Sequence, residues 1–185
     1  MPKLVLASAS PRRKELLQRL VPEFTVMKPW VAEQIYPGEL PERAAARLAL
    51  EKATEVAGTL AQPARVIGAD TIVVYDGKML GKPRDAQEAH QMLALLADGW
   101  HEVVTGMAVV DAPEGRAQTC HEVTRVHFAP IPETALEAYL LTNEPYDKAG
   151  GYGIQGWAGR YIDRIEGCFF NVMGLPLACL GKMLL

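Results

Sequence analysis

The feature that most constrains this chain is a short apolar strand followed at once by a cationic helix start, over residues 4–17. The run from Leu4 to Ala7 predicts a buried strand. Ser10 is a favourable N-cap, and Pro11 suits the first helical position. Leucines then recur at helical spacing, at positions 16, 17 and 20. The stretch therefore predicts a strand, a tight loop and a helix.

Three cations occupy the first turn of this predicted helix, namely Arg12, Arg13 and Lys14. The helix dipole is positive there, so each exposed cation is disfavoured by roughly 0.3–1 kcal/mol. The turn is either a solvated basic surface or the binding site of an anion, for which phosphate is the usual ligand of a helix start. Because the cations follow two serines and a proline, we favour phosphate.

Composition indicates an ordinary soluble globular protein. The chain has 185 residues, of which 49% are hydrophobic and 22% charged, and we expect a single domain over residues 1–185. The net charge of −3 argues against a nucleic-acid partner bound by a basic surface. No stretch approaches the roughly 18 apolar residues of a membrane span, and no signal peptide is evident. We therefore expect a cytoplasmic protein with no membrane partner.

The three cysteines, Cys120, Cys168 and Cys179, lack metal-ligand and CxxC spacing. An odd number of cysteines in a chain without an export signal favours reduced thiols.

A helix rich in alanine and leucine is predicted from Pro41 to Gly58. Its apolar stripe contains Ala45, Leu48, Ala49, Ala53 and Val56, and Lys52 falls on the same stripe. A lysine there either extends its ammonium to solvent or approaches a buried anion, and the sequence leaves both open.

The strand predicted from Val66 to Tyr75 is interrupted by Asp70, a residue disfavoured in strands. The aspartate either faces water at an edge or is held on the strand to bind a metal or activate water. Gly68 and Ala69 would leave the backbone open to a ligand, which favours the second interpretation. The turn Asp76-Gly77 predicts a hairpin that brings Lys82 back toward Asp70.

Further elements follow in order. We expect a helix capped by Asp85 and ended by Gly99, then a long hairpin of residues 101–110 and 116–128 in which Gly106 marks a bulge or a close approach. A short helix over residues 132–141 comes next. Residues 161–165 and 168–173 are predicted to pair as a last hairpin, and Gly174-Leu175-Pro176 to begin a C-terminal helix.

Four glycines lie within residues 150–156, inside the stretch from Asn143 to Gly156. Such a segment is either a flexible linker or a loop that allows close approach of the backbone. Tyr152 and Ile154 would be unusual in a linker. Gln155 offers a donor and an acceptor suited to the edge of a nucleobase.

Together these features favour hydrolysis of a phosphoanhydride. The cations suit a polyphosphate, and the carboxylates of Asp70 and Glu33 suit a divalent hard metal, although Glu33 by itself reads as a solvated loop residue. The sequence contains neither the P-loop pattern GxxxxGK[ST] nor a GxGxxG after a strand.

Five motifs in this order resemble those of the Maf family of house-cleaning nucleoside triphosphate pyrophosphatases. They are Ser8-Ala9-Ser10-Pro11-Arg12-Arg13, Gly68-Ala69-Asp70-Thr71, Gly81-Lys82-Pro83, the stretch from Asp147 to Gly156, and the stretch from Asn171 to Leu177. The resemblance implies an α/β fold like that of inosine triphosphate pyrophosphatases, with an elongated mixed sheet flanked by helices and a central cleft. It also implies a homodimer and a divalent metal: Mg²⁺, Mn²⁺ or Co²⁺.

The resemblance further implies a role for each matching residue. Asp70 would be the general base and, with Glu33, would hold the metal. The triphosphate would lie across the helix start at Ser10 and contact Ser8, Arg13, Lys52 and Lys82. Arg12, Thr71 and Gln155 would determine specificity.

The Tyr-Gly-Ile-Gln-Gly segment resembles the subgroup that acts on dTTP, UTP and modified pyrimidine triphosphates. A different base such as 7-methyl-GTP is one alternative, because Gly151, Trp157-Ala158 and Cys168-Phe169-Phe170 depart from the family pattern. A nucleotide-binding regulator of septum formation without catalysis is another. Asp70 argues against the regulator, since a carboxylate beside a polyanion does not assist binding.

Overall fold

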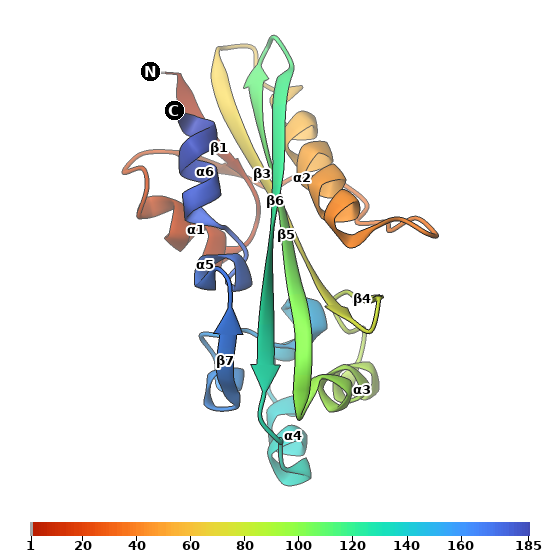
Figure 1. Ribbon diagram of the computed structural model, residues 1–185. Helices are drawn as coiled ribbons and strands as arrows, with labels where there is room; N and C mark the ends of the chain where they lie inside the picture. Colours follow the sequence, from red (N-terminus) through yellow and green to blue (C-terminus); the bar gives the residue numbers. More distant parts are fainter. Residues whose placement is uncertain (1) are drawn as a thin grey trace. The chain divides into compact units, whose positions relative to one another are not determined.

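The computed structural model describes residues 2–185 (Figure 1). Its strands are β1 (Lys3–Ala7), β2 (Thr25–Met27), β3 (Ala64–Tyr75), β4 (Lys78–Leu80), β5 (Gly99–Ala112), β6 (Arg116–Phe128) and β7 (Ile162–Glu166). Its α-helices are α1 (Pro11–Gln18), α2 (Pro41–Ala57), α3 (Ala86–Leu96), α4 (Glu133–Leu140), α5 (Phe169–Val172) and α6 (Leu177–Leu184). Three 3-10 helices, η1 (Pro145–Asp147), η2 (Ala149–Gly151) and η3 (Trp157–Arg160), lie between α4 and β7.

The strands form one mixed sheet in the order β2-β1-β3-β5-β6-β7, with β4 paired to β3. β1 runs parallel to both β2 and β3, whereas the β3–β4 and β6–β7 pairs are antiparallel. The predicted α/β class with a mixed sheet flanked by helices is therefore confirmed, while the central cleft stays a prediction. Within the described residues, every helix is too short or too polar to cross a lipid bilayer.

The chain forms two compact units. Unit 1 comprises the chain up to Thr71, Thr105–Glu122 and Gly174–Leu185, and unit 2 comprises Ile72–Val104 and Val123–Met173. Strands β3, β5 and β6 each contribute residues to both units. The expectation of one domain over residues 1–185 stays a prediction.

The core of unit 1 is built where α2 packs on the sheet. Its buried side chains are mostly small: Val5, Ala7, Ala49, Ala53, Val56, Ala57, Ala64, Val66, Ala108, Val110 and Ala112. Two strand glycines let the helix backbone come close. A Cβ atom at Gly68 would lie 2.1 Å from the Ala49 carbonyl oxygen, and one at Gly106 would lie 2.1 Å from the Ala45 carbonyl carbon. The close approach predicted at Gly106 is confirmed.

The interpretation of Gly68 as an opening for a ligand is wrong. The space above it is filled by the backbone of α2, which needs a residue without a side chain at this position. The sequence pattern indicated a close contact correctly but could not say which group makes it. The consequence for the site is that the helix is held close to the part of β3 that carries Asp70.

The start of the first helix is as predicted, but the helix ends at Gln18, and Leu20, which continued the predicted leucine pattern, lies beyond it and is exposed. Ser10 adopts an extended backbone conformation, its Oγ accepts a hydrogen bond from the Arg13 backbone N–H at 3.4 Å, and Pro11 is the first helical residue. Leu16 and Leu17 are buried.

The predicted end of one helix and the predicted start of the strand that follows it, both in unit 2, differ from the structure. Helix α3 begins after Asp85, whose Oδ1 accepts the Glu88 backbone N–H at 2.8 Å, but it ends at Leu96 rather than near Gly99. Asp98 takes the left-handed turn, with φ of 54°, and Gly99 is the first residue of β5.

The predicted last hairpin is also wrong. Strand β7 pairs with β6, and residues 169–172 form the short helix α5 instead of a second strand. Buried Asn171 explains the difference, because its Nδ2 donates to the Val103 carbonyl and to Thr124 Oγ1, both at 2.9 Å. These tertiary bonds override the strand preference of the adjacent aromatic and β-branched residues.

Cys120 in β6 and Cys179 in α6 lie against each other in unit 1, with their Cα atoms 7.4 Å apart. A Cα separation above about 7 Å is longer than a disulfide spans, so the expectation of reduced thiols stays a prediction for this pair, and Cys168 takes part in no disulfide. The two cysteines are 59 residues apart in sequence, so only the packing of α6 beside the sheet brings them together.

Candidate active site

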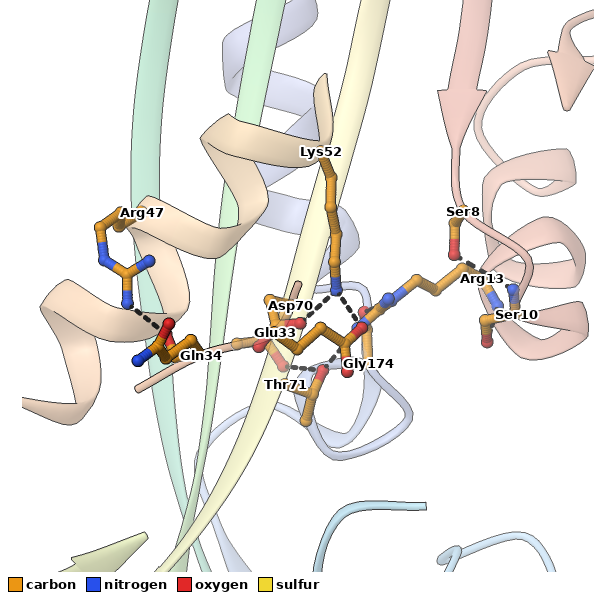
Figure 2. A network of polar contacts seen from close by, with 11 residues as sticks. Ser8, Ser10, Arg13, Glu33, Gln34, Arg47, Lys52, Asp70, Thr71 and Gly174 are labelled. Atoms are coloured by element: carbon orange, nitrogen blue, oxygen red, sulfur yellow. Dashed lines mark hydrogen bonds and ion pairs between the residues drawn. The ribbon is translucent and has the colours of Figure 1, made fainter. Parts of the chain in front are cut away.

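Lys52 and two carboxylates form the centre of the candidate site, which lies in unit 1 (Figure 2). The Lys52 ammonium donates to Asp70 Oδ1 in a very short ion pair and to Glu33 Oε1 at 2.7 Å. Lys52 is 5% exposed and Asp70 is 7% exposed, whereas Glu33 is exposed. Lys52, on the inner face of α2, therefore contacts two carboxylates, and Asp70 is shielded from water.

Arg13 joins this cluster from α1 (Figure 2). Its Nε donates to the Gly174 carbonyl at 2.9 Å, and its Nη2 donates to Thr71 Oγ1 at 3.0 Å. Thr71 also shares a hydrogen bond of 2.9 Å with buried Thr105 on β5. Burial lowers the pKa of Arg13, and the negative charges of Asp70 and Glu33 oppose this shift. The guanidinium is thus fixed in direction beside the two carboxylates.

The loop between β1 and α1 is ordered by its serines. Buried Ser8 accepts the Ser10 backbone N–H on its Oγ at 3.1 Å, and Ser10 in turn caps α1. Arg12 is half-buried in the first turn of the helix, one residue before Arg13. The two serines predicted to bind phosphate therefore sit on a loop whose backbone is fixed by its own hydroxyl groups.

Arg47 holds the loop that carries Glu33. It donates to both carboxylate oxygens of Glu39, from Nε and Nη2 at 2.7 Å each, to Glu51 Oε1 at 2.9 Å, and to the Gln34 carbonyl at 2.8 Å. Hydrogen bonding to Glu39 raises the pKa of Arg47, and the same bond lowers the pKa of Glu39. Figure 2 shows Arg47 and Lys52 projecting from the same helix toward neighbouring residues of this loop.

Two predicted site residues belong to unit 2. Lys82 is exposed and follows β4, in which Leu80 lies opposite Val73 of β3. Gln155 is exposed in a turn between η2 and η3. Since Asp70 belongs to unit 1, the proximity of Lys82 and Asp70 stays a prediction.

Among residues 2–185, no group of three or more His, Cys, Asp or Glu side chains is arranged to hold a metal ion. The pair of Glu33 and Asp70 nevertheless fits Mg²⁺, because both are hard oxygen donors that meet at one ammonium. Mg²⁺ usually takes one or two carboxylates and completes its shell with water and substrate phosphate. The donor set is therefore suitable for a metal that arrives with a polyphosphate.

Three residues of this network were missed in the sequence. Arg47 could have been found, since Glu39 and Glu51 flank it and Glu51 lies one helical turn away. Gly174 adopts a positive φ of 104° and contributes only its backbone carbonyl. Every residue has this group, so the sequence could not single it out. Thr105 lies in an apolar strand without any local sign of its contact with Thr71.

Comparison with known proteins agrees with the geometry. Residues 3–185 match the family model described as Maf-like protein. A protein of Carboxydothermus hydrogenoformans named dTTP/UTP pyrophosphatase is 43% identical over 98% of this chain and 97% of its own length. A protein of the same name from Alkaliphilus oremlandii is 47% identical over 100% of this chain and 95% of its own.

Among solved structures, a HAM1 protein from Coxiella burnetii aligns with a TM-score of 0.48 and 18% identity, covering 72% of this chain and 76% of its own. The family match spans almost the whole chain and includes every residue of the cluster around Lys52, so this chain belongs to the Maf family.

Proposed function

We propose that this protein hydrolyses dTTP and UTP to the nucleoside monophosphate and pyrophosphate. The observation that carries the proposal is the convergence of Asp70, Glu33 and Lys52 beside Arg13 and the start of α1. The full-length relatives named dTTP/UTP pyrophosphatase support the choice of substrate. Modified pyrimidine triphosphates are included in the proposed substrate class, as the resemblance to this subgroup implies.

The triphosphate would bind at the start of α1, where Ser8 and Ser10 fix the loop. Backbone N–H groups and the positive end of the helix dipole favour an anion there. Arg12 and Arg13 supply positive charge, and the fork of Arg13 is directed by Thr71 and Gly174. Lys82 is proposed to bind the same polyphosphate.

Asp70 is proposed as the general base that takes a proton from the attacking water. It is held on a strand rather than a loop, and its Oδ1 is fixed by Lys52. Lys52 neutralises negative charge around Asp70 and Glu33, so that a polyanion can approach two carboxylates. The water would attack the α-phosphorus, and pyrophosphate would leave with the electrons of the broken P–O bond.

Glu33 and Asp70 are the residues proposed to hold a divalent metal, Mg²⁺ or Mn²⁺, with Co²⁺ as a further candidate. When bound, the ion would neutralise phosphate oxygens and stabilise the charge that develops on the leaving pyrophosphate. We also propose that the protein acts in the cytoplasm as a homodimer, which light scattering after gel filtration would test.

The test measures pyrophosphate release from dTTP, UTP, CTP, GTP, ATP and 7-methyl-GTP, with each metal and with chelator. We expect release from dTTP and UTP, dependent on metal. Asp70→Asn should lower kcat by about 10²–10⁴-fold, the usual contribution of a general base. The matched control is Asp111→Asn, which alters a carboxylate on another strand of unit 1 that is paired with Arg65 at 3.2 Å.

Hydrolysis of 7-methyl-GTP alone would refute the substrate assignment and leave the reaction intact. Release from no nucleotide, together with nucleotide binding, would favour the regulator of septum formation. Wild-type turnover in Asp70→Asn would refute the role given to Asp70.

A further inference from the structure

We propose that His101 and Glu144 are positioning residues that fix the exposed turn carrying Gln155 and thereby set base selectivity. This inference rests on the proposed function and on the expectation from the sequence that Gln155 meets the edge of the nucleobase. All the residues that carry it belong to unit 2.

The turn itself is short and closed. The Gly156 backbone N–H donates to the Gly153 carbonyl at 3.0 Å, so Gln155 occupies the third position of a four-residue turn. Its side chain is exposed, while Tyr152 before the turn is buried and Trp157 after it is half-buried. An exposed glutamine thus lies between two anchored aromatic residues.

Tyr152 is anchored by His101. The phenol oxygen lies 2.6 Å from His101 Nε2, and the Tyr152 ring packs edge-on against both His101 and Phe128. Burial lowers the pKa of His101 to about 4 and raises the pKa of Tyr152, so both groups stay uncharged near neutral pH. The side of the turn that precedes Gln155 is therefore held by one directional bond inside an apolar cluster.

His101 is a costly choice if its only role is to fill space. Its Nδ1 is buried and has no hydrogen-bond partner among residues 2–185. An apolar side chain of similar shape would avoid that loss. What the imidazole adds over such a side chain is the bond from Nε2 to Tyr152, which fixes the position of the tyrosine.

Trp157 is anchored by Glu144. The Trp157 backbone N–H donates to Glu144 Oε1 at 3.1 Å, and the indole stacks on Tyr139 with ring centroids 4.1 Å apart. The Glu144 carboxylate fills the space beside Gly156, where a Cβ atom would lie 1.8 Å from Oε1. Glycine at position 156 is therefore needed for Glu144 to reach the backbone that follows Gln155.

Fixing both sides of the turn matters because a glutamine amide can match two opposite base edges. Uracil and thymine present an N–H donor beside a carbonyl acceptor, whereas cytosine presents an acceptor beside an amino donor. An amide free to rotate pairs with either edge, since it carries both a donor and an acceptor. A rigid turn fixes the backbone of Gln155 and the direction in which its side chain reaches the base, which favours one of the two pairings.

The test compares kcat/KM for UTP and CTP in variants that release each anchor. Tyr152→Phe removes the bond to His101 while keeping the ring. Gly156→Ala displaces the flexible end of Glu144, whose atoms are the nearest to the added Cβ. Each is expected to lower the UTP-to-CTP ratio about tenfold, mainly through KM for UTP. Glu144→Gln keeps an acceptor for Trp157 and should keep the wild-type ratio.

The matched control is Tyr146→Phe, which removes a tyrosine bond to the Leu140 carbonyl at 2.8 Å in the same unit. A role confined to stability would lower activity on UTP and CTP equally in all these variants. The proposal is overturned if Tyr152→Phe and Gly156→Ala keep the ratio within twofold of wild type, or if Tyr146→Phe changes it as much as they do.

Hydrogen exchange of the Gly156 amide supplies a second measurement that needs no turnover. Exchange should accelerate at least tenfold in Tyr152→Phe and in Gly156→Ala, and unchanged exchange would overturn the anchoring. A wild-type protein that hydrolyses no nucleotide would refute the proposed function, while the exchange data would still decide whether His101 and Glu144 fix the turn.

Discussion

Replacing Gly68 by alanine should damage stability and activity together. The added Cβ would lie 2.1 Å from the Ala49 carbonyl oxygen and 3.0 Å from the backbone nitrogen of Ala53. These are backbone atoms of α2, so no side-chain rotation relieves the overlap. The helix must retreat by about 1.3 Å to restore ordinary contact with the strand.

The size of the effect follows from that displacement. Overpacking of a core costs about 1–3 kcal/mol. In a chain of this length such a loss lowers Tm by about 2–12 °C. Lys52 lies on α2 between the two crowded residues, and Asp70 lies on the same strand face as Gly68, so the displacement also lengthens their ion pair. A shift of about 1 Å in a catalytic group can lower turnover by about 10²-fold.

The assay is thermal unfolding and pyrophosphate release, measured on Gly68→Ala and on Gly58→Ala. Gly58 ends α2 with helical dihedrals, and a Cβ there would lie 3.5 Å from its nearest neighbour, which is ordinary contact. The control should therefore keep wild-type stability and rate. A Gly68→Ala protein with unchanged Tm and kcat would refute the claim that the approach of α2 to β3 sets the site.

Three further predictions concern charge. Lys52→Met leaves buried Asp70 without its partner and should lower the free energy of unfolding by about 3–5 kcal/mol in urea titrations, with much of the loss recovered in the double variant with Asp70→Asn. Arg47→Met should speed hydrogen exchange of amides 34–39 and lower kcat, because it frees the loop that carries Glu33. The folded-state pKa of His101, about 4, lies below its ordinary value of 6.5, so the unfolded chain binds more protons in between. The protonation of His101 therefore costs no stability above pH 6.5 and should lower the free energy of unfolding by about 3 kcal/mol as the pH drops to 4. The His101→Phe variant should lack this contribution to the pH dependence.

Local chemistry made part of the fold predictable. The cap at Ser10 and the Asp76-Gly77 hairpin depend on residues adjacent in sequence, and both are as expected. Lys52 and Asp70 were each recognisable because a charge interrupts an apolar pattern, and buried charges need partners. The sequence could not indicate that these two interruptions satisfy each other, since that depends on how α2 crosses β3.

The errors share one cause, which is a tertiary contact that overrides a local preference. By local preference, residues 169–172 would form a strand. In the structure these four residues form helix α5, and Asn171 in that helix donates hydrogen bonds to β5 and β6. Gly68 marked a close approach, but the approaching group is a helix rather than a ligand.

Charge counting links the cluster in unit 1 to the proposed chemistry. Lys52 and Arg13 carry two positive charges, and Asp70 and Glu33 carry two negative ones, so the four side chains are neutral as a group. A triphosphate therefore gains no net attraction from them and needs further cations. In the proposed mechanism these are the metal, Arg12 and Lys82. Because the charges of these four side chains cancel as a group, we expect chelation of the metal to abolish turnover rather than reduce it. Substantial turnover with chelator present would mean that Lys52 releases its carboxylates to meet the phosphate instead.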